Sequence, residues 1–302
     1  MALERLWVST RLIVGGHILN PLWWSAERRR ARRSDVFGRV VTDYLRRHYL
    51  SAADHLKDTG ICQTEPERIF TIWFQGEGNA PLLVKNCFAS IRKHCTQELV
   101  VLDEKSVFDW ITLPQVIVDK FRAGKMKYAH FSDICRVELL HEHGGYWLDA
   151  TAFVTHPIPE FIEDCDFFVY RSGKRISGYY SYVQNCFIHA RKGAFLLEAW
   201  RDMILKFWEE EDKRVDYFQH QLMLKVLAQG NGTAMKLFSA MPQVDHDGIH
   251  SLWYLHGDEQ ADESKLGELV SPEFFFQKTS YREAPKAKPG TWRDYILKQT
   301  EG

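Results

Sequence analysis

Residues 128–157 read YAHFSDICRVELLHEHGGYWLDATAFVTHP and contain the change from helix to strand that decides the fold. A polar turn at Ser132 and Asp133 comes first, and an apolar helical face follows over residues 134–140. The glycine pair at 144–145 suits a helix end with a left-handed backbone. We therefore expect a helix that stops at this pair and passes directly into the next element.

The element after the glycine pair predicts where a ligand binds. Residues 146–148 form a short apolar run typical of a buried strand, and Asp149 ends it. Open α/β sheets bind their ligands at the carboxyl ends of strands. Asp133 and Arg136 are three residues apart, so they share one face of the preceding helix. This helix and strand are therefore predicted to form one wall of a ligand site.

Apolar runs alternate with amphipathic runs along the rest of the chain. This alternation predicts an α/β fold in which a mostly parallel sheet is covered by helices. The expected strands are 69–74, 98–103, 167–170 and 182–190, and the expected helices are 81–94, 107–111, 114–121, 193–210 and 216–228.

Residues 1–60 are predicted to be a helical appendage, and residues 61–302 the main domain. Residues 1–50 contain ten arginines and four acids next to an apolar, tryptophan-bearing run. This combination is typical of an anchor on a membrane surface. A helical layer packed on the main domain, with its arginines in water, explains the same pattern. We expect a cytoplasmic protein, held on the cytoplasmic face of the inner membrane if the anchor interpretation holds.

Composition excludes several classes of function. The net charge of −1 gives no field that favours nucleic acid. The six cysteines are scattered without a CxxC pair, which favours reduced thiols in a reducing compartment. No run approaches the ~18 to 20 apolar residues of a membrane span. The phosphate-binding pattern GxxxxGK[ST] and the nucleophile pattern GxSxG are absent from the sequence.

Four polar residues downstream are further candidates for a site. Asn185 interrupts a predicted strand, where it is either a satisfied core amide or a ligand contact. Asp216 precedes a helix and favours an N-cap role, and His220 lies one turn later on the same face. Lys278 follows an apolar run, a suitable position for a cation that binds a diphosphate.

The motifs together resemble a known family. FSDICRVELLHEHGGYWLDAT is similar to the signature of the capsular polysaccharide synthesis glycosyltransferases, which are related to retaining glycosyltransferases with a GT-A fold. TIWFQGEGNAP, VVLDEKSVFDWI, VQNCFIHARKGAFLLEAW and VDYFQHQLML also resemble family segments. The resemblance covers about residues 67–228, with a weaker match at FFFQKTSY, and residues 1–60 lie outside it. It implies a GT-A-type, Rossmann-like sheet.

The resemblance also implies an activity and site roles. Such an enzyme transfers a sugar from a nucleotide-diphospho-sugar, with a UDP-sugar favoured, to a glycan or lipid-linked acceptor in bacterial surface polysaccharide synthesis, with retention. Asp216 or His220 would orient the acceptor, or act as the base if the enzyme inverts. Asn185 would belong to the same catalytic group. The residues implied in donor binding are Trp73 and Gln75 (base and ribose), Asp133 (ribose or sugar), Arg136 (sugar or phosphate), Asp149 and Lys278.

One position departs from the wider group. Asp149 corresponds to the first acid of a D-x-D metal motif, but Thr151 replaces the second acid. Either Asp149 holds Mn²⁺ or Mg²⁺ with a C-terminal histidine, for which we favour His250 over His246 and His256, or Lys278 and nearby cations replace part of the metal's role. The departure also supports a rival interpretation, namely a catalytically inactive, sugar-nucleotide-binding or scaffold subunit of a membrane-associated assembly complex.

Overall fold

The central feature of the fold is a five-stranded sheet with the strand order β2-β1-β3-β6-β5. The computed structural model describes residues 26–63, 68–172 and 182–299, and the backbone alone over 26–35. A second, two-stranded sheet pairs β4 with β7. The strands are β1 (Arg68–Ile72), β2 (Glu98–Leu102), β3 (Gly145–Leu148), β4 (Ala152–Val154), β5 (Phe167–Phe168), β6 (Phe187–Ala190) and β7 (Phe276–Lys278).

The predicted mostly parallel sheet is confirmed. β1 pairs in parallel with both β2 and β3. β6 runs antiparallel to β3 and to β5, so β5 points the same way as the other three strands. The carboxyl ends of β1, β2 and β3 therefore meet at one edge of the sheet, where the sequence places its candidate ligand residues.

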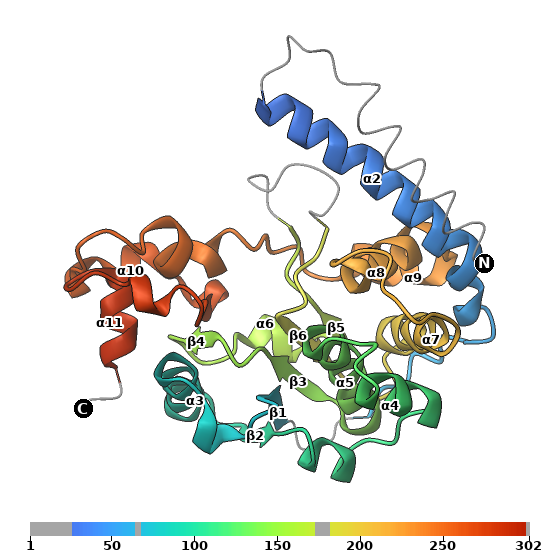
Figure 1. The fold of residues 1–302 in the computed structure, drawn as a ribbon, viewed down its shortest axis with the longest axis horizontal. Coiled ribbons are helices and arrows are strands. Elements are labelled where there is room, and N and C mark those ends of the chain that lie inside the picture. The colour runs from blue at the N-terminus through green and yellow to red at the C-terminus, as the bar shows by residue number, and fades with distance from the viewer. Residues whose placement is uncertain (1–25, 64–67, 173–181, 300–302) are drawn as a thin grey trace.

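Helices cover this sheet, as predicted. α5 packs on β1, β3 and β6 and is covered in turn by α7, while α3 contacts β2 and β4. α3 and α5 lie on opposite sides of the sheet in Figure 1. The helices are α2 (Ala26–Tyr49), α3 (Leu82–His94), α4 (Gln115–Arg122), α5 (Tyr128–His143), α6 (Glu160–Glu163), α7 (Phe195–Glu210), α8 (Gln219–Gly230), α9 (Gly232–Ala240), α10 (Leu266–Leu269) and α11 (Trp292–Lys298).

The second half of α2 is part of the main core. Val41, Tyr44 and Leu45 are buried in the same apolar cluster as the sheet. The hydroxyl groups of Tyr44 and Tyr49 donate to the carboxylate of Glu211, just after α7. The first half of α2 extends away from the body (Figure 1).

The domain boundary at residue 60 stays a prediction, and the apolar run before residue 26 lies outside the described residues. Within the described ranges, none of the helices is both long and apolar enough to cross a membrane.

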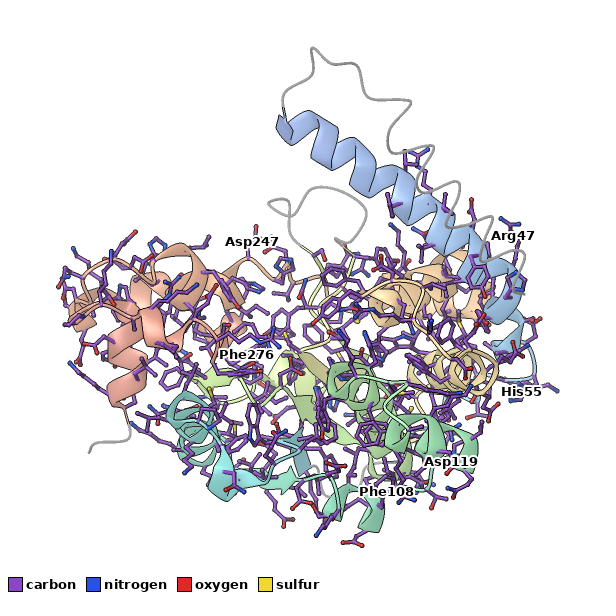
Figure 2. The ribbon with its side chains drawn as sticks, in the orientation of Figure 1. Arg47, His55, Phe108, Asp119, Asp247 and Phe276 are labelled. Atoms are coloured by element: carbon purple, nitrogen blue, oxygen red, sulfur yellow. The ribbon has the colours of Figure 1, made fainter. Side chains whose placement is uncertain are left out.

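A second apolar cluster joins the C-terminal segments to the sheet. Leu83 of α3 and Phe153 of β4 pack there with Trp253, Val270 and Trp292. Phe276 of β7 lies where these segments meet the sheet (Figure 2). Five tryptophans in the part that the structure describes are almost fully buried, namely Trp147, Trp200, Trp208, Trp253 and Trp292. All six cysteines are free.

Two local predictions were wrong. Ser132 and Asp133 do not form a turn before the helix, because α5 already begins at Tyr128. Their polar groups serve the site instead: Arg136 donates to the carbonyl oxygen of Ser132 and pairs with Asp133. The predicted strand 182–190 is also shorter, so that Asn185 precedes β6 rather than interrupting it.

The glycine pair ends α5 as predicted. Gly144 has φ 64° and Gly145 has φ 95°, which L-residues with a side chain rarely adopt. A Cβ atom on Gly145 would lie 2.5 Å from the carbonyl oxygen of Arg68 in β1. Gly145 is therefore required both by the backbone turn and by the close approach of β3 to β1.

The change Gly145→Ala is expected to lower the free energy of unfolding by about 2–4 kcal/mol, because the strained φ and the contact with Arg68 add together. Urea unfolding monitored by circular dichroism measures this loss. Gly124→Ala is the matched control: Gly124 has φ 69°, and a Cβ atom added there would meet nothing within 4 Å, so this variant isolates the backbone cost. Equal losses in the two variants would show that the close approach to Arg68 contributes nothing.

Candidate active site

A cavity of about 400 Å³ opens at the carboxyl ends of β1 and β3. A larger cavity of about 740 Å³ adjoins it, and Phe74 and Gln75 line both. Phe108, which lines the larger cavity, lies at the edge of the molecule (Figure 2). The predicted site residues that line the smaller cavity are Trp73, Gln75, Asp133, Arg136, Asp149 and Asn185.

Arg136 lies between the two carboxylates of the site. Its Nη2 atom is 3.3 Å from Asp133 Oδ1 and 3.5 Å from Asp149 Oδ1. Its Nη1 atom donates to the carbonyl oxygen of Asn185, and its guanidinium group stacks 4.8 Å from the centre of the Trp147 ring. Burial, the largest single influence, raises the pKa of Asp133, but Arg136, His220 and His130 together outweigh it and hold the pKa below its usual range.

Lys278 binds the second carboxylate. Its Nζ atom donates to Asp149 Oδ2 at 2.6 Å and to Thr151 Oγ1 at 2.7 Å. Trp147 Nε1 donates to the other oxygen of Asp149 at 3.0 Å. Burial opposes the charge on Asp149, but Lys278 and Arg136 hold its pKa below the usual range. Asp149 raises the pKa of Lys278 in turn, despite burial, so the pair is charged on both sides.

These residues do not fit Mn²⁺ or Mg²⁺ held by Asp149 and His250. Thr151 offers a hydroxyl where a carboxylate is needed, and that hydroxyl accepts from Lys278. His250 is engaged through Nδ1 at the carbonyl oxygen of His246. In the described part of the chain, a close group of three potential ligands is formed instead by Glu138, His141 and Glu142 of α5, where His141 pairs with Glu198 of α7.

His220 contacts the side chain of Asn185, which in turn binds Asp133. Asn185 Nδ2 donates to Asp133 Oδ1 at 3.0 Å and contacts His220 Nδ1 at 2.9 Å, while Gln221 donates to Asn185 Oδ1. Because the amide group of Asn185 donates this hydrogen bond, Nδ1 of His220 accepts it and carries no proton. Burial lowers the pKa of His220 to about 3, so the ring is neutral near pH 7. With 2% of its surface exposed, His220 positions Asn185 rather than touching a ligand.

Asp216 is not among the residues that line the smaller cavity. Its Oδ1 atom accepts from the backbone N–H of Phe218, which fixes the loop before α8. The next residue, Tyr217, lines the cavity with Tyr281 and Arg282 from the segment after β7. These three residues were not predicted from the sequence. The available signal was the tyrosine inside each of the matched segments VDYFQHQLML (Tyr217) and FFFQKTSY (Tyr281).

The fold and the site define an α/β protein with a charged ligand cavity at the carboxyl edge of its sheet. Residues 24–296 match the family described as capsular polysaccharide synthesis protein, and the chain belongs to that family. The predicted family is therefore confirmed. The match also includes α2 and the C-terminal segments, which extends it well beyond residues 67–228.

Two individual relatives are more distant. The chain is 22% identical over 198 residues to Glycosyltransferase afumC of Aspergillus fumigatus, which is 58% of this chain and 50% of that protein. The chain thus spans about half the length of this relative. A solved structure, PaToxG Glycosyltransferase, is 14% identical with a TM-score of 0.43, over 80% of this chain and 98% of that one. A likeness at this level carries no conclusion about chemistry.

The buried, neutral His220 predicts a pH dependence of stability. The unfolded chain binds a proton on this ring near pH 6.5, but the folded chain binds it only near pH 3. The unfolded state is therefore favoured as pH falls below about 6.5, and His220 accounts for about 2 kcal/mol of lost stability at pH 5. His220→Asn keeps an acceptor for Asn185 and should reduce the loss between pH 7 and pH 5 by this amount. Urea unfolding at both values measures it, and an unchanged loss would contradict the assignment.

Proposed function

We propose that this protein is a glycosyltransferase that moves a sugar from a nucleotide-diphospho-sugar to a glycan or lipid-linked acceptor in surface polysaccharide synthesis. The observation that carries the proposal is a cavity at the sheet edge that is lined by Asp133, Arg136 and Asp149, with Lys278 paired to Asp149. Carboxylates accept hydrogen bonds from sugar hydroxyls, and cations neutralise a leaving diphosphate. Family membership supports the same conclusion.

The two adjoining cavities suit the two halves of such a donor. The larger one, beyond Phe74 and Gln75, offers apolar and polar surface for a nucleoside. The indole N–H of Trp73 is buried without a hydrogen-bond partner among the described residues, so a ligand oxygen can take it. The sugar would then lie over Asp133 and Asn185, with the diphosphate toward Lys278. The GT-A-type arrangement and the choice of a UDP-sugar are parts of this proposal.

Retention at the anomeric carbon is the favoured outcome. A retaining transfer can pass the acceptor's proton to the leaving phosphate, so it needs no side-chain base. Asp133 and Asp149 are weak bases, because neighbouring cations hold their pKa values below the usual range. His220 is covered and already engaged by Asn185. An inverting reaction would need one of these groups as its base.

Replacing either carboxylate should slow transfer strongly. Asp133→Asn and Asp149→Asn are expected to lower the rate of nucleoside diphosphate release about 100- to 1,000-fold, because each removes a charge that is preorganised around the donor. Asp119→Asn is the matched control, since Asp119 is an exposed residue of α4 (Figure 2). Release is measured with purified protein, a panel of nucleotide-diphospho-sugars and a mixed glycan acceptor pool.

Two results would contradict the proposal. Equal rates in Asp119→Asn, Asp133→Asn and Asp149→Asn would remove the carboxylates from the reaction. Absence of release by the wild type with every donor, together with donor binding in calorimetry, would favour the catalytically inactive binding subunit. Nuclear magnetic resonance of the product decides the stereochemistry, and an inverted anomeric centre would exclude retention.

We also propose that the N-terminal region brings the enzyme to an anionic membrane surface. The support is a cluster of five arginines within residues 28–33, ahead of the half of α2 that packs in the core. Each basic residue near such a surface contributes about 1 kcal/mol. A peripheral position would place the active site near lipid-linked acceptors.

Vesicle flotation tests this location. Replacing Arg28, Arg29, Arg30, Arg32 and Arg33 by glutamine should abolish flotation with phosphatidylglycerol vesicles, while the wild type floats at low salt and is released at high salt. The charge-matched control replaces five exposed lysines elsewhere, namely Lys236, Lys265, Lys286, Lys288 and Lys298. Loss of binding in both variants would show a general charge effect, and flotation of both would remove the arginine cluster from the proposal.

A further inference from the structure

Lys278 contacts Asp149 and Thr151, the two residues that stand in the place of the D-x-D metal motif. Two of its three N–H groups point to Asp149 Oδ2 and Thr151 Oγ1, which both belong to residues that line the cavity. The third remains for an oxygen of a ligand. The side chain of Lys278 is 20% exposed, so part of it is open to solvent next to these two lining residues.

The backbone fixes this lysine more firmly than a loop would. Lys278 is paired with Ala152 in the antiparallel register of β4 and β7. The backbone N–H and the hydroxyl of Thr279 both donate to the carbonyl oxygen of Thr151 at 2.8 Å. On the other side, fully buried Gln277 bonds to Gly248 and Leu252. The ammonium group is therefore held in place before any ligand binds.

The charge balance also disfavours an additional ion. A divalent cation on Asp149 would lie beside the ammonium group of Lys278 and the guanidinium group of Arg136, both already within 3.5 Å of that carboxylate. An ion that took Asp149 from Lys278 would leave the largely buried ammonium group without its partner, which is costly. Thr151 has no negative charge with which to compensate.

We infer that Lys278 is the resident cation of the site and takes the place of a divalent metal ion in transfer. This inference rests on the proposed glycosyltransferase function. In the reaction, the bond from the anomeric carbon to the diphosphate breaks, the bond to the acceptor oxygen forms, and the acceptor's proton passes to the leaving phosphate. Lys278 stays protonated throughout and donates to the diphosphate oxygens on which negative charge accumulates.

Binding of UDP measured by isothermal titration calorimetry tests the inference separately from turnover. The wild type should bind UDP with the same Kd in EDTA and in Mn²⁺, and sugar release should be equally insensitive. Lys278→Met should weaken UDP binding about 10- to 100-fold, because it removes a charge-assisted contact. Lys278→Arg, which keeps the charge, should bind more tightly than Lys278→Met. Thermal unfolding of each variant checks its fold.

A double variant makes the test independent of a folding defect. Thr151→Asp combined with Lys278→Met replaces the internal cation by a second carboxylate and should bind UDP in Mn²⁺ but not in EDTA. Wild-type binding only in Mn²⁺, or full affinity of Lys278→Met in EDTA, would overturn the role of Lys278 while leaving the proposed function intact. Failure of the folded wild type to bind UDP, GDP or ADP in either buffer would overturn both.

Discussion

The site depends on four charged side chains that lie close together, largely buried, and neutralise one another. Asp133, Arg136, Asp149 and Lys278 are each within reach of an opposite charge, and removing one partner of such a buried pair typically costs about 3–5 kcal/mol. The four residues come from α5, from the end of β3 and from β7. Helix, sheet and C-terminal strand must therefore all be in place before the charges balance.

The parts of the site that are close in sequence could be predicted. Asp133 and Arg136 share a helical face by their spacing, and Asp149 follows a buried strand, so local periodicity was enough to group them. The end of α5 at the glycine pair could also be predicted, because the positive φ angles of Gly144 and Gly145 disfavour a side chain. These features depend on neighbours within one or two turns of the chain.

The remaining parts depend on contacts that local patterns do not encode. Lys278 meets Asp149 across 129 residues, and the direction of β6 relative to β3 follows from a connection rather than from an apolar run. Ser132 and Asp133 favour turns by their local chemistry, but their pairing with Arg136 inside α5 prevails. The contact between His220 and Asn185 could likewise not be predicted, because the sequence shows only a single histidine on a helix.

The pairing of β7 with β4 has a consequence for the order in which the protein matures. A chain emerging from the ribosome has made α5, β3 and Asp149 long before Lys278 is synthesised, so the early intermediate carries an incomplete cluster with excess negative charge. Anionic nucleotides should be repelled by this intermediate and retained only after β7 has docked. A ligand that binds only the finished state stabilises it, so under the proposed function nucleotide would stabilise completed molecules selectively.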